Sequence, residues 1–303
     1  MTNDAKAAAM PASRLGVVLI VLLTVLWGVN WPVMKIGLNA LPPLTFRGAI
    51  VPVGGALLLL LARLGGLAIT IRRDQWKPLL IAALFNVTGW HTTSAFGISF
   101  MESGRASVIA FTMPVWSVLM SVFFFDERLS GRTMLALVCG LGGIGILLGG
   151  DIATLGRAPL GPLFMLASAV LWAAGTVYQK KIDWAMPVLT LTAWQLLLGS
   201  LPIVGLALFY ESPGLAAFTP AALGAIAFNI VGPLCFCYYA WFKIVDLYPA
   251  TVAGVSTLMV PVIGVISGGL VLEEPLGLGE IAALALVGSA IVLVLIVPKT
   301  PAT

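Results

Sequence analysis

The amino-acid sequence predicts an all-α integral membrane protein with ten transmembrane helices, built from two inverted five-helix repeats. Three observations lead to this fold class. Hydrophobic residues make up 60% of the chain and charged residues 9%, with a mean hydropathy of +1.08, whereas soluble domains carry about 25% charged residues. Ten apolar stretches are each long enough to cross a bilayer core, which takes about 20 residues. The motifs of the first half also return, in the same order, in the second half.

Each predicted span is an apolar run bounded by charged residues, proline or glycine. A short polar lead precedes the first run. That run is too long for the apolar core of a signal peptide and shows no cleavage site of small residues, so we expect it to stay as the first helix. The predicted spans are residues 15–35, 43–62, 77–99, 103–125, 132–150, 160–180, 187–209, 221–243, 250–272 and 278–297.

Positive charges predict how the spans are oriented, because cytoplasmic loops are enriched in lysine and arginine. A cytoplasmic N-terminus puts twelve of these residues on the cytoplasmic side and three on the other side, with Arg47 inside a span. We therefore expect both termini in the cytoplasm, which an even number of spans allows. The twelve are Lys6, Arg14, Arg63, Arg72, Arg73, Lys77, Arg128, Arg132, Lys180, Lys181, Lys243 and Lys299, and the three are Lys35, Arg105 and Arg157.

Three stretches of the first half recur in the second half with an offset of 143 to 147 residues. The matched pairs are "WGVNWPVMK" from Trp27 with "WAAGTVYQK" from Trp172, "FNVTG" at 85–89 with "FNIVG" at 228–232, and the stretch from Ala106 with that from Ala253, which aligns Pro114 with Pro261 and Asp126–Glu127 with Glu273–Glu274. We interpret residues 1–150 and 151–303 as two repeats of five spans each. Because five is odd, the second repeat enters the membrane from the opposite side, an arrangement that many secondary transporters share.

Several of these motifs resemble the EamA-type members of the drug/metabolite transporter superfamily. The resemblance lies in "WGVN" late in the first span, in Arg47 early in the second, and in a fourth span whose central Pro114 leads to "DER". The "EEP" after the ninth span resembles the repeated acidic end of the same pattern. Within the superfamily, the tryptophan-rich inner helices and His91 look most like the bacterial YddG-type amino-acid exporters.

The resemblance covers essentially the whole chain and implies both a fold and a function. The implied fold is a basket of ten helices around a central cavity between the two repeats. The implied function is export of neutral and aromatic amino acids by alternating access across the bacterial inner (plasma) membrane, which the chain crosses as a multi-pass protein. The expected partners are these substrates and the lipid bilayer. No cofactor is expected, and a monomer and a homodimer both fit the sequence.

His91 is the only histidine of the chain and lies in the third predicted span, three residues past its centre. At 1.5 Å per residue it is about 4–5 Å towards the outer side. Asn86, Trp90 and Thr93 form a stripe beside it, and polar residues at this depth should face the bundle interior or a cavity. We interpret His91 as a substrate-binding residue. The alternative is a structural histidine that is hydrogen-bonded to a neighbouring helix.

Five further residues within the spans are predicted to bind the substrate. Trp27 and Trp172 correspond in the repeat and lie near the centres of their spans, where interfacial belts do not explain a tryptophan. Their indole rings can form an apolar wall for a substrate side chain. Asn30, Asn229 and Tyr239 offer oxygen atoms to an ammonium group without the cost of a buried carboxylate. The alternatives are core packing for the tryptophans and interhelical hydrogen bonds for the polar groups.

Arg47 is a candidate gate residue, about five residues inside the outer end of the second span. Its guanidinium could meet the carboxylate of a substrate or pair with Glu102. Trp194 is taken as the repeat counterpart of Arg47, near the inner end of the seventh span, and is the second candidate gate residue. The alternative for Arg47 is a side chain that snorkels to the outer surface.

Pro32, Pro114 and Pro261 are predicted to interrupt their helices. Each removes a backbone hydrogen bond and frees a carbonyl group nearby. We interpret them as hinges that shape the cavity or flex during transport. Simple bends that improve helix packing are the alternative.

No aspartate or glutamate lies in the middle of a predicted span, whereas proton-coupled carriers often use a carboxylate within the membrane. His91 is the one ordinary proton acceptor at that depth. Without an acidic partner it should stay neutral for much of the transport cycle, so we favour facilitated diffusion of the substrate down its own gradient. The alternative is an exporter of other small amphiphilic metabolites or drugs, with proton coupling through His91.

Other classes of protein fit the sequence less well. An intramembrane enzyme would need a nucleophile with its base or a metal cluster, so we predict no enzymatic activity. The three cysteines, Cys139, Cys235 and Cys237, lie in apolar runs without the spacing of metal ligands. A channel would need a sustained polar face, and nucleic-acid binding would need a basic run with interleaved aromatic residues. The sequence has neither.

Overall fold

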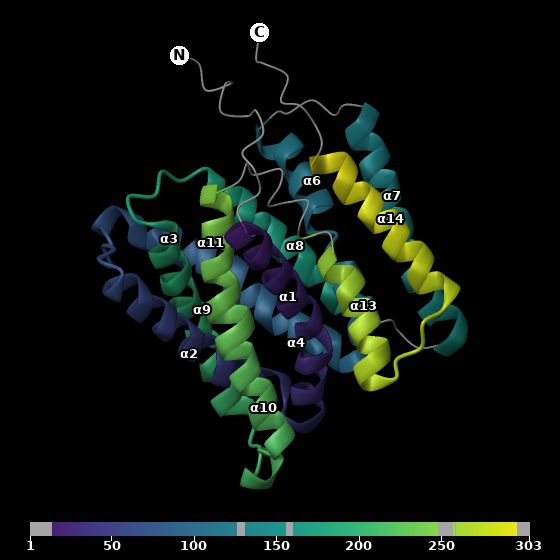
Figure 1. Cartoon of the computed structure of the whole chain (residues 1–303), viewed down its shortest axis with the longest axis horizontal. Helices are drawn as coiled ribbons and strands as arrows, with labels where there is room; N and C mark the ends of the chain where they lie inside the picture. The colour runs from purple at the N-terminus through teal and green to yellow at the C-terminus, as the bar shows by residue number, and fades with distance from the viewer. Residues whose placement is uncertain (1–13, 126–130, 156–159, 248–256, 258, 296–303) are drawn as a thin grey trace.

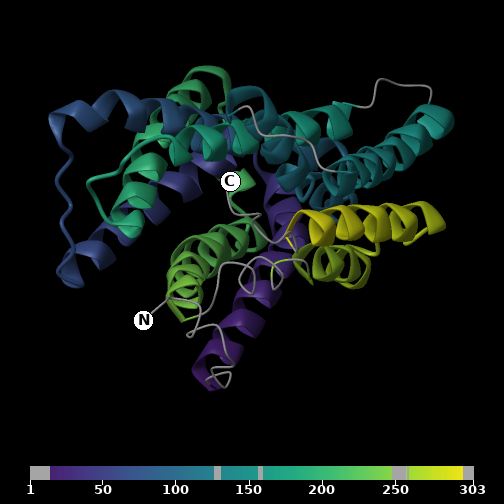
Figure 2. The same ribbon diagram turned by 90° about the horizontal axis from the view of Figure 1, so that it is seen from above.

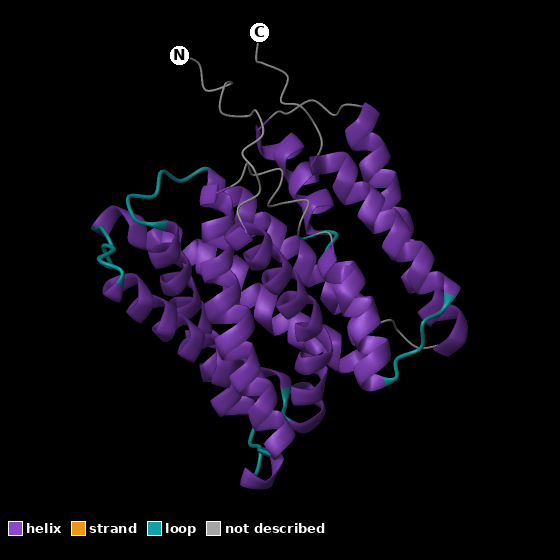
Figure 3. Cartoon of the chain, in the orientation of Figure 1, coloured by secondary structure: helices purple, strands orange, loops and turns teal. Residues whose placement is uncertain are grey.

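The computed structural model describes residues 14–125, 131–155, 160–247, 257 and 259–295. These residues form helices joined by loops, with no strand among them (Figure 3). The helices α7 (Gly131–Leu155) and α14 (Leu278–Leu295) pair at one edge of the bundle (Figure 1). They lie on the side opposite α2 (Pro43–Leu64) and α3 (Trp76–Ala83), as the view from above shows (Figure 2). The predicted all-α membrane fold is confirmed.

The first half forms helices close to the predicted spans. Its first helix continues to Ala40, so Lys35 is helical rather than part of an outer loop. The third span is one helical run with a π-helical segment in it, and the fourth breaks at Phe111 and Thr112. The remaining elements of this half are α1 (Arg14–Ala40), the 3₁₀-helix η2 (Arg73–Gln75), the π-helix η3 (Leu84–Gly89), α4 (Trp90–Phe100), α5 (Ser103–Ala110) and α6 (Met113–Phe125).

The second half repeats this order. Its eighth predicted span is again one helical run that contains a π-helical segment. Of the ninth predicted span, residues 250–256 and 258 lie outside the described part of the chain. The elements of this half are α8 (Leu160–Lys180), α9 (Val188–Tyr210), the 3₁₀-helix η4 (Leu215–Ala217), α10 (Pro220–Asn229), the π-helix η5 (Ile230–Phe236), α11 (Cys237–Leu247), α13 (Met259–Leu272) and α14.

The outer surface of the bundle is apolar, as the bilayer requires. Within the described part of the chain, five helical segments are long and apolar enough to cross a membrane: Arg14–Ala40, Pro43–Leu64, Leu160–Lys180, Val188–Tyr210 and Pro220–Trp241. Large apolar side chains point away from the bundle, and Leu208, Phe209 and Leu270 are each about four-fifths exposed. Such a surface is stable against lipid tails but not against water. The chain is therefore an integral membrane protein.

Two carboxylates tie the halves together at one end of the bundle. We call the end at which α1 finishes the outer end and the end at which α1 begins the inner end. Glu211, just after α9, accepts hydrogen bonds from the first turn of α2, at Leu44 N (3.0 Å) and at Thr45 N and Oγ1 (2.6 and 2.7 Å). Glu274, just after α13, accepts in the same way from Ser103 N (2.6 Å) and Gly104 N (2.9 Å) of α5. A negative charge stabilises a helix N-terminus because the free N–H groups there carry partial positive charge.

The two π-helical segments coincide with the repeated "FN" motifs. Asn86 lies inside η3, and Asn229 is the last residue before η5. A π-helical turn widens the helix by one residue and is common at functional sites. In η5 the bend is reinforced by Pro233, which has no N–H to donate. Both halves therefore depart from the α-helix at matching places.

Candidate functional site

A cavity of about 510 Å³ lies inside the bundle. Residues from both halves line it, and most of them come from α1, α2, α4, α8, α9, α11 and the two π-helical segments, with single residues from α6, α10 and α13. Its wall combines indole rings with polar side chains. The aromatic residues are Trp27, Trp31, Trp90, Phe111, Trp172, Tyr238 and Trp241, and the polar ones are Asn30, Arg47, Asn86, His91, Ser94, Thr176, Gln179, Thr192, Gln195, Asn229 and Thr257. No aspartate, glutamate or lysine is among the described lining residues.

Five of the six predicted substrate-binding residues meet at this cavity: His91, Trp172, Trp27, Asn30 and Asn229. Tyr239 does not, and this corrects its predicted placement. Its side chain is 48% exposed on the outside of α11, and the neighbouring Tyr238 lines the cavity instead. Adjacent residues of a helix point about 100° apart. A one-residue difference therefore moves a side chain from the cavity to the surface.

The predicted gate residue Arg47 also lines the cavity, near its outer end. It is 4% exposed, and its Nη2 donates to Ser94 Oγ at 3.1 Å. Its Nε has no hydrogen-bond partner in the described part of the chain, and the same holds for His91 Nδ1. Arg47 and His91 thus each have one buried side-chain nitrogen without a hydrogen-bond partner in the described chain.

The predicted pairing of Arg47 with Glu102 is not formed. The carboxylate of Glu102 instead lies 3.4 Å from Arg105 Nη1, one turn along α5. Arg105 also approaches Glu280 of α14 at 3.5 Å and donates to Leu147 O at 2.6 Å. Glu102 precedes α5 at the outer rim of the bundle, where Arg105 is the nearer cation. Arg47 therefore faces the cavity without a carboxylate from the described chain.

Trp194, the second predicted gate residue, lies outside the cavity. Its Nε1 donates to Ile69 O at 2.9 Å, and its ring packs against Trp76 at 6.5 Å between centroids. The helix starts give a better counterpart for Arg47. Because α2 begins at Pro43 and α9 at Val188, the two helices are related by an offset of 145 residues. With this offset Thr192 is the residue that corresponds to Arg47, and Thr192 lines the cavity.

The three predicted hinge prolines occupy different kinds of position. Pro32 lies inside α1 and is buried. Pro114 lies in the first turn of α6, and Pro261 in the first turn of α13 as it is described from Met259. A proline in a first turn removes no helical hydrogen bond, because the N–H groups there have no partner in the helix anyway. The fourth span does break at Phe111 and Thr112, directly before Pro114. The π-helical segments η3 and η5 at the repeated "FN" motifs are two further irregularities, and they were not among the predicted hinges.

The aromatic residues form two groups on the cavity wall. Trp27 lies 6.4 Å from Tyr238 and 6.1 Å from Trp241 between ring centroids, so α1 and α11 share one aromatic surface. Trp90 and Trp172 meet edge to face at 5.2 Å and link α4 to α8. Such contacts stabilise a pair beyond the area that it buries. The two groups give the cavity firm apolar sides.

Three amide side chains join at the wall between η3, α8 and α9. Asn86 Nδ2 donates to Gln179 Oε1 (3.1 Å) and to Gln195 Oε1 (3.2 Å), and Gln195 Nε2 donates to Gln179 Oε1 (2.9 Å). We call these three residues the amide cluster. Gln179 and Gln195 are not among the residues predicted from the sequence. The criterion that selected Asn30, a polar residue within an apolar span, applies equally to both.

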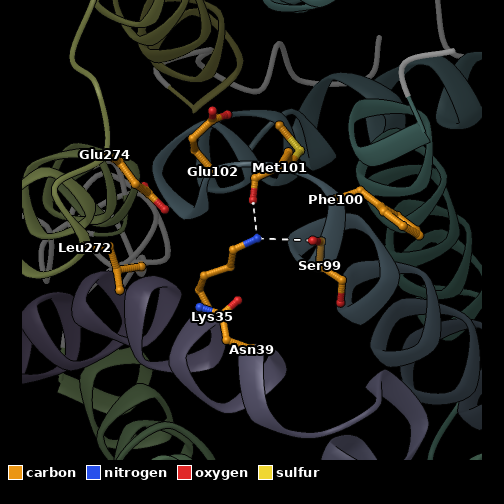
Figure 4. Close-up of a pocket in the computed structure, with 8 residues that line it drawn as sticks. All are labelled: Lys35, Asn39, Ser99, Phe100, Met101, Glu102, Leu272 and Glu274. Carbon is orange, nitrogen blue, oxygen red and sulfur yellow. Dashed lines mark hydrogen bonds between the residues drawn. The ribbon is translucent and has the colours of Figure 1, made fainter. Parts of the chain in front are cut away.

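The outer end of the bundle is closed by polar contacts around Lys35. Its Nζ donates to three carbonyl groups at the end of α4, those of Ile98 (2.7 Å), Ser99 (3.2 Å) and Met101 (3.0 Å). Figure 4 draws the bonds to Ser99 and Met101. A second hollow of about 390 Å³ surrounds this lysine, with Glu274 of the second half at its edge (Figure 4). A cation at a helix C-terminus is stabilised by the free carbonyl groups there. Lys35 therefore fastens α1 to α4.

The exposure of the lining residues differs between the two ends of the cavity. Its outermost lining residues are almost fully buried, with exposed fractions of 4% for Met34 and 1% for Ser94. At the other end, Val188, in the first turn of α9, lines the cavity and is 53% exposed. An internal polar cavity between the two halves of a membrane bundle is typical of one class of protein, the membrane transporters of small molecules.

The chain belongs to the EamA-like transporter family, whose sequence model matches residues 14–149 and 159–296, and so to the drug/metabolite transporter superfamily. It is 30% identical to the uncharacterized transporter YvbV of Bacillus subtilis, over 94% of this chain and 92% of that protein. It is 27% identical to a probable amino-acid metabolite efflux pump of Escherichia coli, over 87% of this chain and 89% of that protein. A solved crystal structure with 19% identity superposes with a TM-score of 0.66 over 92% of this chain and 95% of that one, which shows the shared fold.

Proposed function

We propose that this protein is a secondary transporter that exports neutral and aromatic amino acids from the cytoplasm by alternating access. The composition of the cavity wall carries the proposal. Among the described lining residues there is one guanidinium, that of Arg47, together with uncharged polar groups and indole rings, and no carboxylate. One cation suits the single carboxylate of a neutral amino acid. A sugar phosphate or nucleotide sugar would need several cations.

The polar groups of the outer part of the cavity suit a zwitterion. Arg47 is the only described lining residue with a full positive charge, and its unpaired Nε can donate to a carboxylate. Asn30 Oδ1 is buried without a hydrogen-bond partner in the described chain and can accept from an ammonium group. His91 Nδ1 can serve either group, according to its tautomer. An unpaired buried polar atom is costly, so a ligand that pairs these atoms would be stabilised.

The apolar part of the cavity suits an aromatic or aliphatic side chain. Trp27, Trp172 and Tyr238 present ring faces and edges that bind such groups by burial and by aromatic contacts. The cavity volume of about 510 Å³ lies in the usual range for small-molecule sites. The substrate class is therefore proposed to be neutral amino acids with apolar side chains, rather than charged ones.

Alternating access is proposed to use the two halves as inverted repeats. The outer end is held by Glu211, Glu274 and Lys35, while Val188, the lining residue in the first turn of α9 at the inner end, is exposed. If both termini are cytoplasmic, as the positive charges indicate, this arrangement is the loading state of an exporter in the bacterial inner membrane. Release would require the outer contacts to open and the inner end to close.

Transport is proposed to be facilitated diffusion. A coupling proton needs a group that binds it at depth, and the described cavity wall offers no carboxylate for this role.

The names of two relatives support export as the direction, since both the Escherichia coli and the Salmonella typhimurium relatives are called probable amino-acid metabolite efflux pumps.

Reconstitution tests the proposal directly. The purified protein is placed in liposomes, and the movement of a panel of labelled amino acids is measured without ATP, with protein-free liposomes as the control. We expect phenylalanine, tryptophan and leucine to equilibrate faster than through protein-free liposomes, and lysine and glutamate not to. Transport of an unrelated metabolite, with none of the amino acids moved, would overturn the substrate class while leaving a transporter.

A further inference from the structure

The amide cluster has a donor that the protein itself does not use. Gln179 Oε1 accepts two hydrogen bonds, from Asn86 and from Gln195, so the carboxamide of Gln179 is held in one orientation. No hydrogen bond from its Nε2 is formed in the described part of the chain, and Gln179 lines the cavity. Gln195 Nε2 carries a second hydrogen beyond the one that it gives to Gln179. The cluster therefore places free N–H groups on the wall of the cavity.

These donors lie far from Arg47 along the cavity. Arg47 is bonded to Ser94, which follows Asn86 by eight residues on the same span. At 1.5 Å per residue the two levels are about 12 Å apart. The carboxylate and ammonium groups of an α-amino acid are attached to the same carbon atom. One such molecule therefore cannot bind Arg47 and the amide cluster at the same time with these two groups.

The two glutamines of the amide cluster have no amide counterparts in the first half. With the offset of 145 that relates the helix starts, Gln179 corresponds to Met34 and Gln195 to Ile50, both of which also line the cavity. The helices of the first half thus pack at the matching place without any such amides. Packing of the repeat does not by itself require Gln179 and Gln195.

We infer that the amide cluster is a second carboxylate-binding station, at the inner part of the cavity, where Gln179 Nε2 donates to the carboxylate of an incoming substrate. The inference rests on the proposed function, since the export of amino acids supplies the carboxylate. A carboxylate only accepts hydrogen bonds, so it matches a site made of N–H donors. Uncharged donors hold it less strongly than a guanidinium does, which favours onward movement from the amide cluster to Arg47.

The substitution Gln179→Glu tests the station. It keeps the oxygen that accepts from Asn86 and Gln195, but replaces the free N–H donor by a negative charge. Lys180→Gln is the matched control, because it changes the net charge by the same amount at the adjacent exposed residue. The probes are 3-phenylpropionate, which has only the carboxylate, 2-phenylethylamine, which has only the ammonium group, and phenylalanine. Binding is measured by thermal stabilisation of the full-length purified protein.

We expect Gln179→Glu to weaken binding of 3-phenylpropionate and phenylalanine by about 10-fold or more, because like charges then meet, and to leave 2-phenylethylamine as tightly bound or tighter. Lys180→Gln should change none of the three. If Gln179→Glu does not give a monodisperse protein, Gln195→Glu is used, since it removes a donor of the same cluster. A merely structural role would weaken all three probes together.

The outcomes separate this inference from the proposed function. Equal binding of 3-phenylpropionate by the wild type and Gln179→Glu, or no binding of it by the wild type, would overturn the station. If the wild type binds 3-phenylpropionate through Gln179 but liposomes show no amino-acid movement, the station stands and the proposed function fails.

Discussion

Arg47 and Ser94 are joined by a hydrogen bond of 3.1 Å that links α2 to α4 at the outer part of the cavity. This bond is the only one that the guanidinium makes within the described chain, although the arginine is 4% exposed. A buried cation without a carboxylate beside it is unusual, because burial removes the water that stabilises its charge. The arrangement is explained if an anionic group of the substrate completes it during transport.

Replacement of Arg47 by glutamine should therefore weaken transport of substrates that carry a carboxylate. Glutamine keeps an N–H donor on a shorter side chain but lacks the charge. A hydrogen bond to a charged group contributes about 1.5–3 kcal/mol, which predicts about a 10- to 100-fold rise in the substrate concentration for half-maximal transport. The measurement is the initial rate of phenylalanine movement in liposomes. Ser94→Ala is the control and should cost less, since it leaves the guanidinium in place. A half-maximal concentration that Arg47→Gln leaves unchanged would contradict the role.

His91 should act through hydrogen bonding rather than by carrying a proton. His91→Gln keeps a donor and an acceptor but cannot be protonated, so it should retain most transport, whereas His91→Ala should lose most of it. The measurement is phenylalanine movement with and without a pH gradient between about pH 5.5 and pH 8, the range in which histidine changes charge. We expect no accumulation driven by the gradient. Gradient-driven accumulation in the wild type that His91→Gln abolishes would instead establish proton coupling.

Gly175 should be essential to the amide cluster because the Asn86 carboxamide occupies the space where a side chain would begin. A Cβ atom at this position would overlap Asn86 Oδ1. Gly175→Ala should therefore destabilise the protein by about 1–3 kcal/mol, as overpacking of a core does. Thermal unfolding in detergent measures the effect.

The matched control for this substitution is Gly205→Ala, at a helical glycine that has no neighbouring atom within 4 Å of a built Cβ. Because alanine favours a helix over glycine by about 1 kcal/mol, this variant should be unchanged or slightly more stable. Equal melting temperatures for Gly175→Ala and Gly205→Ala would show that the close contact between Gly175 and Asn86 does not affect the stability of the protein.

Glu274 should hold the outer end closed through its bonds to the start of α5. Glu274→Gln removes the charge that stabilises this helix N-terminus, a contribution of about 0.3–1 kcal/mol or more. The population that is open to the outside should rise by up to about 5-fold for each kcal/mol lost. The measurement is labelling of a cysteine at Met34, introduced by Met34→Cys in a background without the native cysteines, by a thiol reagent that does not cross membranes.

Asp74→Asn is the control for this experiment, because Asp74 forms an ion pair with Arg72 in which both side chains are more than 60% exposed. Exposed pairs contribute little to stability, so labelling at Met34→Cys should not change. If Glu274→Gln and Asp74→Asn label alike, the contact at α5 is a cap for that helix and not a gate.

Much of the architecture follows from the order of residue types along the chain. Membrane length, apolar composition and charged loops are local properties, so the spans, the all-helical class and the family could be read without coordinates. Six of the cavity residues, such as His91 and Trp172, could also be predicted from the sequence. A polar or bulky side chain in the middle of a span is expected to face the interior of the bundle. The direction in which a side chain points is less accessible to such reasoning. The sequence predicts Tyr239 as a cavity residue, whereas Tyr238 lines the cavity. The side chains of these two neighbours point in directions about 100° apart around the helix axis.

What only the tertiary structure decided is which distant groups meet. Three sets of contacts join segments that are 47 to 171 residues apart in the sequence: Arg47 with Ser94, Lys35 and Glu274 with their partners at the outer end, and Asn86 with the two glutamines. The two glutamines, Gln179 and Gln195, are 16 residues apart. Apolar periodicity determines that a helix packs, but the rotation and height at which it meets its neighbours depend on the fit of all side chains together. As a result of that fit, Glu102 pairs with Arg105 and not with Arg47. The same fit brings Gln179 and Gln195 to the cavity wall.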